Sequence, residues 1–120
     1  MTESSANAEL AALGEIDRLV HEPGRLMLMA VLYVIDSADF TFLMNQTGLT
    51  WGNLSAHMSK LEEAGYIEVE KSFKGKRPNT MLRLTGKGRE AFQAYRQTMR
   101  AVLEGVPDLP PAPPYREGGS

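Results

Sequence analysis

The amino-acid sequence predicts a mainly α-helical domain with one small β-hairpin, and three observations lead to that expectation. Apolar residues recur at the three- and four-residue spacing of an amphipathic helix near both ends of the chain. Residues 67–70 and 81–84 instead alternate between apolar and polar side chains, as a half-buried strand does. With 120 residues and no cysteine, the chain has the size of a single domain and lacks the thiols for disulfides, thiolate metal sites or a cysteine nucleophile.

The composition also indicates a cytoplasmic protein. The longest apolar run, from Leu26 to Ile35, has ten residues, whereas a bilayer-spanning helix needs about 20. The N-terminal residues lack the basic and apolar regions of a secretory signal peptide. The absence of cysteine fits a reducing compartment, and we expect no membrane association.

The N-terminal part of the chain predicts two helices that follow a flexible segment at residues 1–7. Apolar side chains share one face between Ala8 and Val20, which predicts an amphipathic helix there. Pro23 suits the first turn of the next helix, from Arg25 to Ile35, whose apolar residues occupy every side. Such a helix belongs at the centre of a core, although a buried strand is the alternative for an apolar run. The apolar face of the first helix comprises Leu10, Leu13, Ile16 and Val20.

A short helix is predicted next. Residues 36–39 are polar and predict a connection without regular structure. Thr41 is placed to cap a helix over residues 42–47, because its hydroxyl can accept from a free N–H group of the first turn. Gly48 then ends this helix in a left-handed conformation.

The following helix, predicted over residues 51–64, has one apolar and one polar side. Thr50 caps its start and Gly65 terminates it. At 100° per residue, two apolar side chains, Met58 and Leu61, lie within about 40° of Leu54 on the helical wheel. We expect these three to face the core: Leu54, Met58 and Leu61. The opposite side is small, polar and free of acid: Gly52, Asn53, Ser55, Ala56, Ser59 and Lys60.

A β-hairpin leads from there into the last helix. Residues 67–70 and 81–84 predict its strands, and residues 71–79 predict the turn because they include glycine, proline and asparagine. Thr85 caps a final helix over residues 86–103. The apolar residues of this helix form one stripe: Phe92, Tyr95, Met99 and Val102.

The end of the chain predicts a flexible tail. Five of the seven prolines lie between Pro107 and Pro114, which favours an extended or polyproline conformation over a packed element. We therefore expect one folded domain over residues 8–104 and a Pro-rich tail at residues 105–120.

The formal net charge of −2 conceals a strong asymmetry along the chain. Residues 1–47 carry −5, residues 48–100 carry +5 and residues 101–120 carry −2. A basic block of this kind indicates a face that binds a polyanion. The alternative is a solvated surface with scattered lysines.

The order of the predicted elements is that of a winged helix-turn-helix domain. In such a domain the helix after the turn, here residues 51–64, enters the major groove of DNA. The hairpin, or wing, here residues 71–79, lies on the adjacent backbone or minor groove. The basic residues of the wing form the densest positive patch in the sequence: Lys74, Lys76 and Arg77, together with Lys71 and Arg83.

The chemistry of single side chains extends this interpretation. Asn53 can pair with an adenine edge, while Thr50 and the free N–H groups of its helix suit a phosphate. Trp51 can stack on a sugar, although packing against the preceding helix is the favoured alternative. His57 can donate to a phosphate or be half-buried in the domain. The full set of expected DNA-contacting residues is Thr50, Trp51, Asn53, Ser55, Ala56, His57, Ser59, Lys60, Lys74, Lys76 and Arg77.

Three stretches of the sequence resemble the compact winged-helix transcriptional regulators of the MarR and ArsR groups. They are RLVHEPGRL, DFTFLMNQTGLTWGNLSAHMSKLEEAGYIEVEKSFKGKRPNT and LRLTGKGREAF. The resemblance covers roughly Glu15 to Tyr95 and implies a homodimer that binds DNA sequence-specifically to control transcription. The sequence departs from the pattern at Trp51, where a small or polar residue is commoner, and at Ala56, where a basic or polar one is.

A homodimer is also expected from the apolar residues of the terminal helices. Leaving them in water would forgo about 1.5–3 kcal/mol for each large side chain. We therefore expect helices at both termini to form the dimer interface, and the operator to be a pseudo-palindrome with half-sites about one helical turn apart. The expected interface residues are Leu10, Leu13, Ile16, Phe92, Tyr95, Met99 and Val102.

Other functions are less well supported by the sequence. We expect no cofactor and no metal site, since the two histidines are not spaced as ligands and cysteine is absent. No grouping of nucleophile, base and orienting residue indicates an enzyme. The alternative is a winged helix that binds another protein rather than DNA. An effector of unknown identity would enter between the terminal helices and the DNA-binding part.

Overall fold

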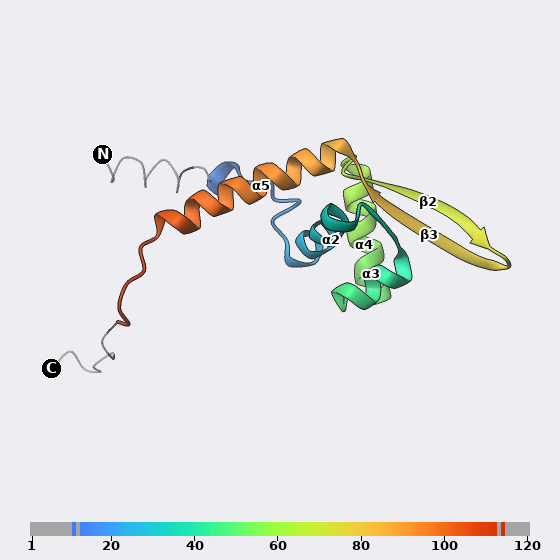
Figure 1. Ribbon diagram of the computed structural model, residues 1–120, viewed down its shortest axis with the longest axis horizontal. Coiled ribbons are helices and arrows are strands. Elements are labelled where there is room, and N and C mark those ends of the chain that lie inside the picture. The colour runs from blue at the N-terminus through green and yellow to red at the C-terminus, as the bar shows by residue number, and fades with distance from the viewer. Residues whose placement is uncertain (1–10, 12, 113, 115–120) are drawn as a thin grey trace.

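The computed structural model of the chain describes residues 11, 13–112 and 114, which form a three-stranded antiparallel sheet and a set of helices around one core. The long helix α5 lies along one side of the domain, and the hairpin of β2 and β3 projects from it (Figure 1). The elements are η1 (Leu13–Glu15), α2 (Pro23–Ile35), β1 (Ser37–Asp39), α3 (Phe40–Thr47), α4 (Trp51–Glu63), β2 (Ile67–Lys74), β3 (Arg77–Leu84) and α5 (Gly86–Gly105).

Helix α2 lies at the centre of the core, as its uniformly apolar sequence predicts. It packs against α3, α4, α5 and β3, and Leu28, Met29 and Leu32 are fully buried. Pro23 stands at its start, where a missing N–H is harmless, and the carboxylate of Glu22 caps the first turn by accepting from the N–H of Arg25. The other fully buried side chains of the core are Val20, Leu43, Leu54, Leu61 and Leu82.

Helix α5 begins on the core and continues beyond it. The hydroxyl of Thr85 accepts from the N–H of Gly88, the cap that the sequence predicts. A Cβ atom at Gly88 would lie 2.1 Å from the carbonyl oxygen of Tyr66, so glycine is needed for α5 to approach the residue that precedes β2. The C-terminal half of α5 extends past α2, α3 and α4, on the side away from the wing (Figure 1).

The helix predicted over Ala8 to Val20 does not continue to Val20. Of the described residues, Ala11 is helical and Leu13–Glu15 form a 3-10 turn, whereas residues 16–22 have no regular helix. The reason is Asp17, whose carboxylate accepts from the N–H groups of Leu19 and Val20 and so replaces the helical backbone bonds. Residues 8–10 and 12, Leu10 among them, lie outside the described residues.

The polar connection predicted at residues 36–39 contains a strand. β1 pairs with β3, with Ser37 opposite Arg83 and Asp39 opposite Met81, and forms the edge of the sheet in the order β1-β3-β2. The pairing is supplied by a partner far along the chain, so local composition does not reveal it. Asp39, not Thr41, caps α3, because its carboxylate accepts from the N–H of Phe42.

The wing is longer than predicted. β2 continues to Lys74 and β3 begins at Arg77, so only Gly75 and Lys76 are left for the turn. Gly75 has a φ of 64°, which glycine adopts without strain. Backbone pairing between the strands therefore overrides the turn-forming composition of residues 71–79. α5 likewise continues to Gly105, two residues beyond the predicted end.

Candidate nucleic-acid interface

The turn between α3 and α4 is short and internally bonded. Gly48 has a φ of 72°, and its N–H donates to the carbonyl of Met44. The buried hydroxyl of Thr47 donates to the carbonyl of Leu43 and accepts from the N–H of Leu49. These bonds fix the angle at which α4 leaves α3, so α4 is presented as a rigid element.

Helix α4 has the two sides that its sequence predicts. Thr50 caps its start through its hydroxyl, 3.2 Å from the N atom of Asn53. Leu54, Met58 and Leu61 are buried, which confirms the predicted core side. On the opposite, polar side, Ser55 is half-buried. The exposed residues of that side are Gly52, Asn53, Ala56, Ser59 and Lys60.

The wing and α4 border a common cleft. Strand register places Lys71 opposite Thr80 and, further out, Phe73 opposite Pro78, on the same face of the hairpin as the buried Ile67. The cleft has a volume of about 350 Å³. Its lining residues come from α3, α4 and both wing strands: Phe40, Thr41, Trp51, Ser55, Met58, Lys71, Pro78, Asn79 and Thr80. Of the polar side of α4, Ser55 lines this cleft, so the concave surface joins Trp51 and Ser55 of α4 to the inner face of the wing.

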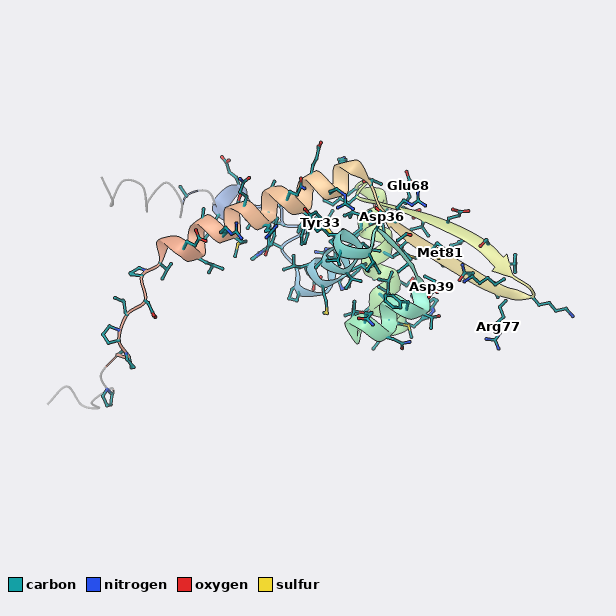
Figure 2. All side chains as sticks on the ribbon, viewed as in Figure 1. Tyr33, Asp36, Asp39, Glu68, Arg77 and Met81 are labelled. Atoms are coloured by element: carbon teal, nitrogen blue, oxygen red, sulfur yellow. The ribbon has the colours of Figure 1, made fainter. Side chains whose placement is uncertain are left out.

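The basic residues of the wing divide into two groups. Lys74, Lys76 and Arg77 are exposed at its tip, and Figure 2 shows Arg77 projecting from the wing near that tip. Arg83 instead lies at the base of the wing, opposite Glu68 in the strand register and on the face away from Lys71. The positive patch predicted from the sequence is therefore divided. Lys71 lies on the inner face, Lys74 and Arg77 are paired on the outer face at the tip, and the charge of Arg83 lies next to an acid.

Trp51 both packs and remains accessible. Its ring lies 5.9 Å from that of Phe40, centroid to centroid, so it contacts the start of the preceding helix α3. The residue is nevertheless 67% exposed and lines the cleft beside the wing. An indole in this position can stack on a planar group without leaving Phe40.

His57 lies apart from the other expected DNA-contacting residues. Its side chain is only 17% exposed and faces the start of α2, where Nε2 is 3.5 Å from Oε2 of Glu22. Burial raises the pKa of Glu22, but hydrogen bonds from the N–H groups of Arg25 and Gly24, with the nearby His57 and Arg25, outweigh burial and lower it below its usual value. The carboxylate is thus ionised at neutral pH.

The expected DNA-contacting set omits several residues of the concave surface. Lys71, Asn79 and Thr80 line the cleft. The first two fall in the turn predicted from the composition of residues 71–79, and Thr80 lies between that turn and the strand predicted at 81–84. Their signal in the sequence is the two-residue alternation of Ile67 and Val69, which, continued by one step, places Lys71 on the inner face.

A second cavity, of about 610 Å³, lies between α2 and α5. It is mainly apolar, with two arginines at one side, and is lined by Leu26, Ala30, Tyr33, Val34, Phe92, Tyr95, Arg96, Met99, Arg100 and Leu103. Tyr95 and Val102, both expected at a dimer interface, are 8% and 7% exposed within the single chain. Leu13, Ile16, Phe92 and Met99 are half-buried.

Among the residues that the structure describes, no group of three or more His, Cys, Asp or Glu side chains is placed to hold a metal ion. Within the same part of the chain, no helix combines the length and the apolar composition needed to cross a bilayer.

Two curated proteins have related sequences. An uncharacterized protein of Methanocaldococcus jannaschii is 41% identical over 71 residues, which cover 59% of this chain and 77% of that protein. The HTH-type transcriptional regulator Hpr of Bacillus licheniformis is 46% identical over 54 residues, covering 42% of this chain and 26% of the regulator. The similarity to Hpr thus spans about a quarter of that protein.

Solved structures share the fold. A transcriptional regulator homologue from Pyrococcus horikoshii has a TM-score of 0.74 at 28% identity, covering 82% of this chain and 96% of that one. A MarR-family regulator from Silicibacter pomeroyi has a TM-score of 0.56 at 19% identity, over 86% and 64% of the two chains. NadR, solved in complex with 4-hydroxyphenylacetate, has a TM-score of 0.55 at 22% identity, over 82% and 70%.

The resemblance to winged-helix transcriptional regulators that the sequence indicates is therefore confirmed, and the fold is shared with a MarR-family regulator. The family and the fold are those of transcription regulators and not of enzymes. Residues 25–103 match the family described as winged helix DNA-binding domain, and the chain belongs to that family.

Proposed function

We propose that this winged-helix transcriptional regulator acts as a homodimer on a pseudo-palindromic operator, with α4 in the major groove and the wing on the adjacent backbone or minor groove. The observation that carries the proposal is the shared concave surface of α4 and the wing. It joins Trp51 and Ser55 of α4 to Lys71 on the wing. The exposed, acid-free polar side of α4 continues from this cleft along the helix, and the basic residues Lys74, Lys76 and Arg77 are exposed further out at the wing tip.

The residues of this surface divide by the part of DNA that they suit. Asn53 is exposed in the first turn of α4 and can read a base edge through its amide. Lys60 and the wing lysines suit phosphates, because a point charge neutralises the backbone without regard to sequence. Arg77, at the wing tip, suits the minor groove, whose negative potential favours arginine.

The dimer part of the proposal is supported by apolar surface near the end of α5. Leu103 is 64% exposed and Val106, just after the helix, is 59% exposed, at the end of α5 that extends past the domain (Figure 1). A second copy would cover these side chains and gain about 1.5–3 kcal/mol for each one buried. Two wings and two α4 helices would then face two half-sites.

The cavity between α2 and α5 supports an effector of apolar, anionic character. Its apolar floor would hold a hydrocarbon or aromatic group, while Arg96 and Arg100 would hold a carboxylate. NadR, which shares the fold, has been solved with 4-hydroxyphenylacetate, a compound of that chemistry. An occupant would contact both α2, which packs on α4, and α5, the proposed dimer helix.

Selection from a random duplex pool, followed by anisotropy titrations at two salt concentrations, tests the DNA-binding proposal. We expect the protein to enrich one pseudo-palindromic sequence and to bind it at least about 1,000-fold more tightly than a scrambled duplex. Lys76→Ala with Arg77→Ala should weaken binding, while Glu90→Gln, an exposed change on α5, should not. Weak binding that ignores sequence would favour the protein-interaction alternative.

A further inference from the structure

His57 is held by two charged residues of another segment. Its Nδ1 atom lies 3.3 Å from Nη1 of Arg25, and its Nε2 atom lies 3.5 Å from Oε2 of Glu22. Because the guanidinium can only donate, Nδ1 accepts, and the remaining ring proton is on Nε2, facing the carboxylate. Both ring nitrogens thus have a partner at the start of α2, and neither is left for DNA.

The backbone of α2 is shaped to admit this imidazole. A Cβ atom at Gly24 would lie 2.5 Å from Nε2 and 2.8 Å from Cδ2 of His57. Glycine in the first turn of a helix costs up to about 1 kcal/mol relative to alanine. Gly24 is buried, and its missing side chain is the space that the His57 ring occupies.

The segment that holds His57 is itself fixed at several points. The Nε atom of Arg25 donates to the carbonyl of Leu19 at 2.6 Å. The hydroxyl of Tyr66 donates to the carboxylate of Asp17. His21 bonds through Nδ1 to the hydroxyl of Tyr95 on α5, at 2.8 Å. Glu22 and Arg25 therefore act as a fixed support and not as a mobile loop.

We propose that His57 is a positioning residue for DNA recognition, through which Glu22 and Arg25 set the rotation of α4 about its own axis. This inference rests on the proposed function. His57 follows Asn53 by four residues, so the two lie on neighbouring turns of the same helix side. A rotation that released His57 would move Asn53 away from its base and would leave the phosphate contacts of the wing in place.

The test compares His57→Ala with Lys74→Ala on the duplex that the wild type selects and on a scrambled duplex. His57→Ala should weaken binding to the selected duplex about tenfold, change the scrambled duplex little and leave the slope of log K against log salt unchanged. Lys74→Ala should weaken both and reduce the slope by about 0.9. A reduced slope or an unchanged affinity for His57→Ala would overturn the proposal.

Gly24 supplies a second, independent arm. Gly24→Ala alone should displace the ring and weaken selected-duplex binding as His57→Ala does. In the His57→Ala background the same change should cost much less, because the ring has left the space and the nearest remaining atom, Oε2 of Glu22, would lie 3.2 Å from the Cβ. Additive losses would show that Gly24 acts by another route and would count against the proposal. Glu90→Gln is the control for a surface change on a helix.

A DNA-independent measurement separates this proposal from the proposed function. Trp51 is the only tryptophan and stands at the start of α4, so its acrylamide quenching reports the setting of that helix. His57→Ala and Glu22→Gln should alter the quenching constant while far-ultraviolet circular dichroism stays native. If the wild type selects no duplex, the proposed function fails. If the quenching constant of His57→Ala equals that of the wild type, the positioning role fails as well.

Discussion

Helices α4 and α5 each bury one side in the core, but their open sides differ in chemistry. α4 presents the polar side chains Asn53, Ser59 and Lys60. Water solvates them in the free protein, and a polyanion can take the place of that water. α5 ends with Leu103, which is 64% exposed and followed closely by the exposed Val106. Polar exposure carries no free-energy penalty in the monomer, whereas apolar exposure does. This difference is the basis of the two proposals, that α4 binds nucleic acid and that the end of α5 binds a second copy of the chain.

The largest expected effect comes from the buried side of α4. Leu54 is fully buried, so Leu54→Ala should lower the free energy of unfolding by about 2–5 kcal/mol, through lost transfer energy and a cavity. Urea denaturation followed by circular dichroism measures it. Asn53→Ala, one residue earlier on the open side, should change stability by less than about 0.5 kcal/mol. Equal losses at the two positions would contradict the assignment of sides.

A polar residue on the open side of α5 should act on assembly and not on folding. Leu103→Ser removes an exposed apolar contact, so the dimer dissociation constant should rise about tenfold to a hundredfold. Sedimentation equilibrium over a concentration series measures this constant. Glu90→Gln, also exposed on α5, should leave it unchanged. Because ordinary dimers have dissociation constants of roughly a micromolar, a wild-type protein that is still monomeric at tens of micromolar would show that α5 forms no such interface.

Truncation on the open side of α4 should change sequence preference. Asn53→Ala removes an amide able to make two hydrogen bonds to adenine, so discrimination between the selected duplex and one altered at that base should fall by about 1–3 kcal/mol. Competition anisotropy with single-base variants of the selected duplex would find the base concerned. A uniform loss across all variants would place Asn53 on a phosphate instead.

The elements that the sequence predicts correctly are those whose signals are local. The caps at Thr50 and Thr85, the left-handed Gly48 and the buried stripe of α4 depend on residues within one or two turns. They define the helix-turn-helix and one side of the candidate site before any tertiary contact is known.

The elements that the sequence mispredicts depend on distant partners. β1 is a strand only because β3 pairs with it, and the helix expected before Val20 is displaced by the turn that Asp17 forms, held by Tyr66. The setting of His57 needs Glu22 and Arg25, more than thirty residues earlier in the chain. Periodicity in the sequence identifies which side of a helix is buried. It does not identify which polar groups of other segments contact that side.

The smallest expected effect is at Tyr66, which lies between α4 and β2 and contacts the start of α5. Its carbonyl accepts from the N–H of Thr85 just before α5, and its hydroxyl donates to Asp17. Burial, the hydrogen bond to Asp17 and the charge of Asp17 raise the pKa of Tyr66 to about 12. Tyr66→Phe should lower the free energy of unfolding at neutral pH by about 0.5–1.5 kcal/mol.

The same pKa fixes how this loss depends on pH. Because the pKa of the tyrosine is higher in the folded chain than the value of about 10 in the unfolded one, its stabilising contribution is complete below pH 10. It then declines as the pH rises toward 12. The difference between wild type and Tyr66→Phe should therefore narrow over that range in urea denaturation. Tyr33→Phe, which removes a hydroxyl that accepts from Gln93, is the matched control. A difference that stays constant up to pH 12 would mean that Asp17 does not hold the Tyr66 proton, and that the segment before α2 is not fixed to Tyr66 by this hydrogen bond.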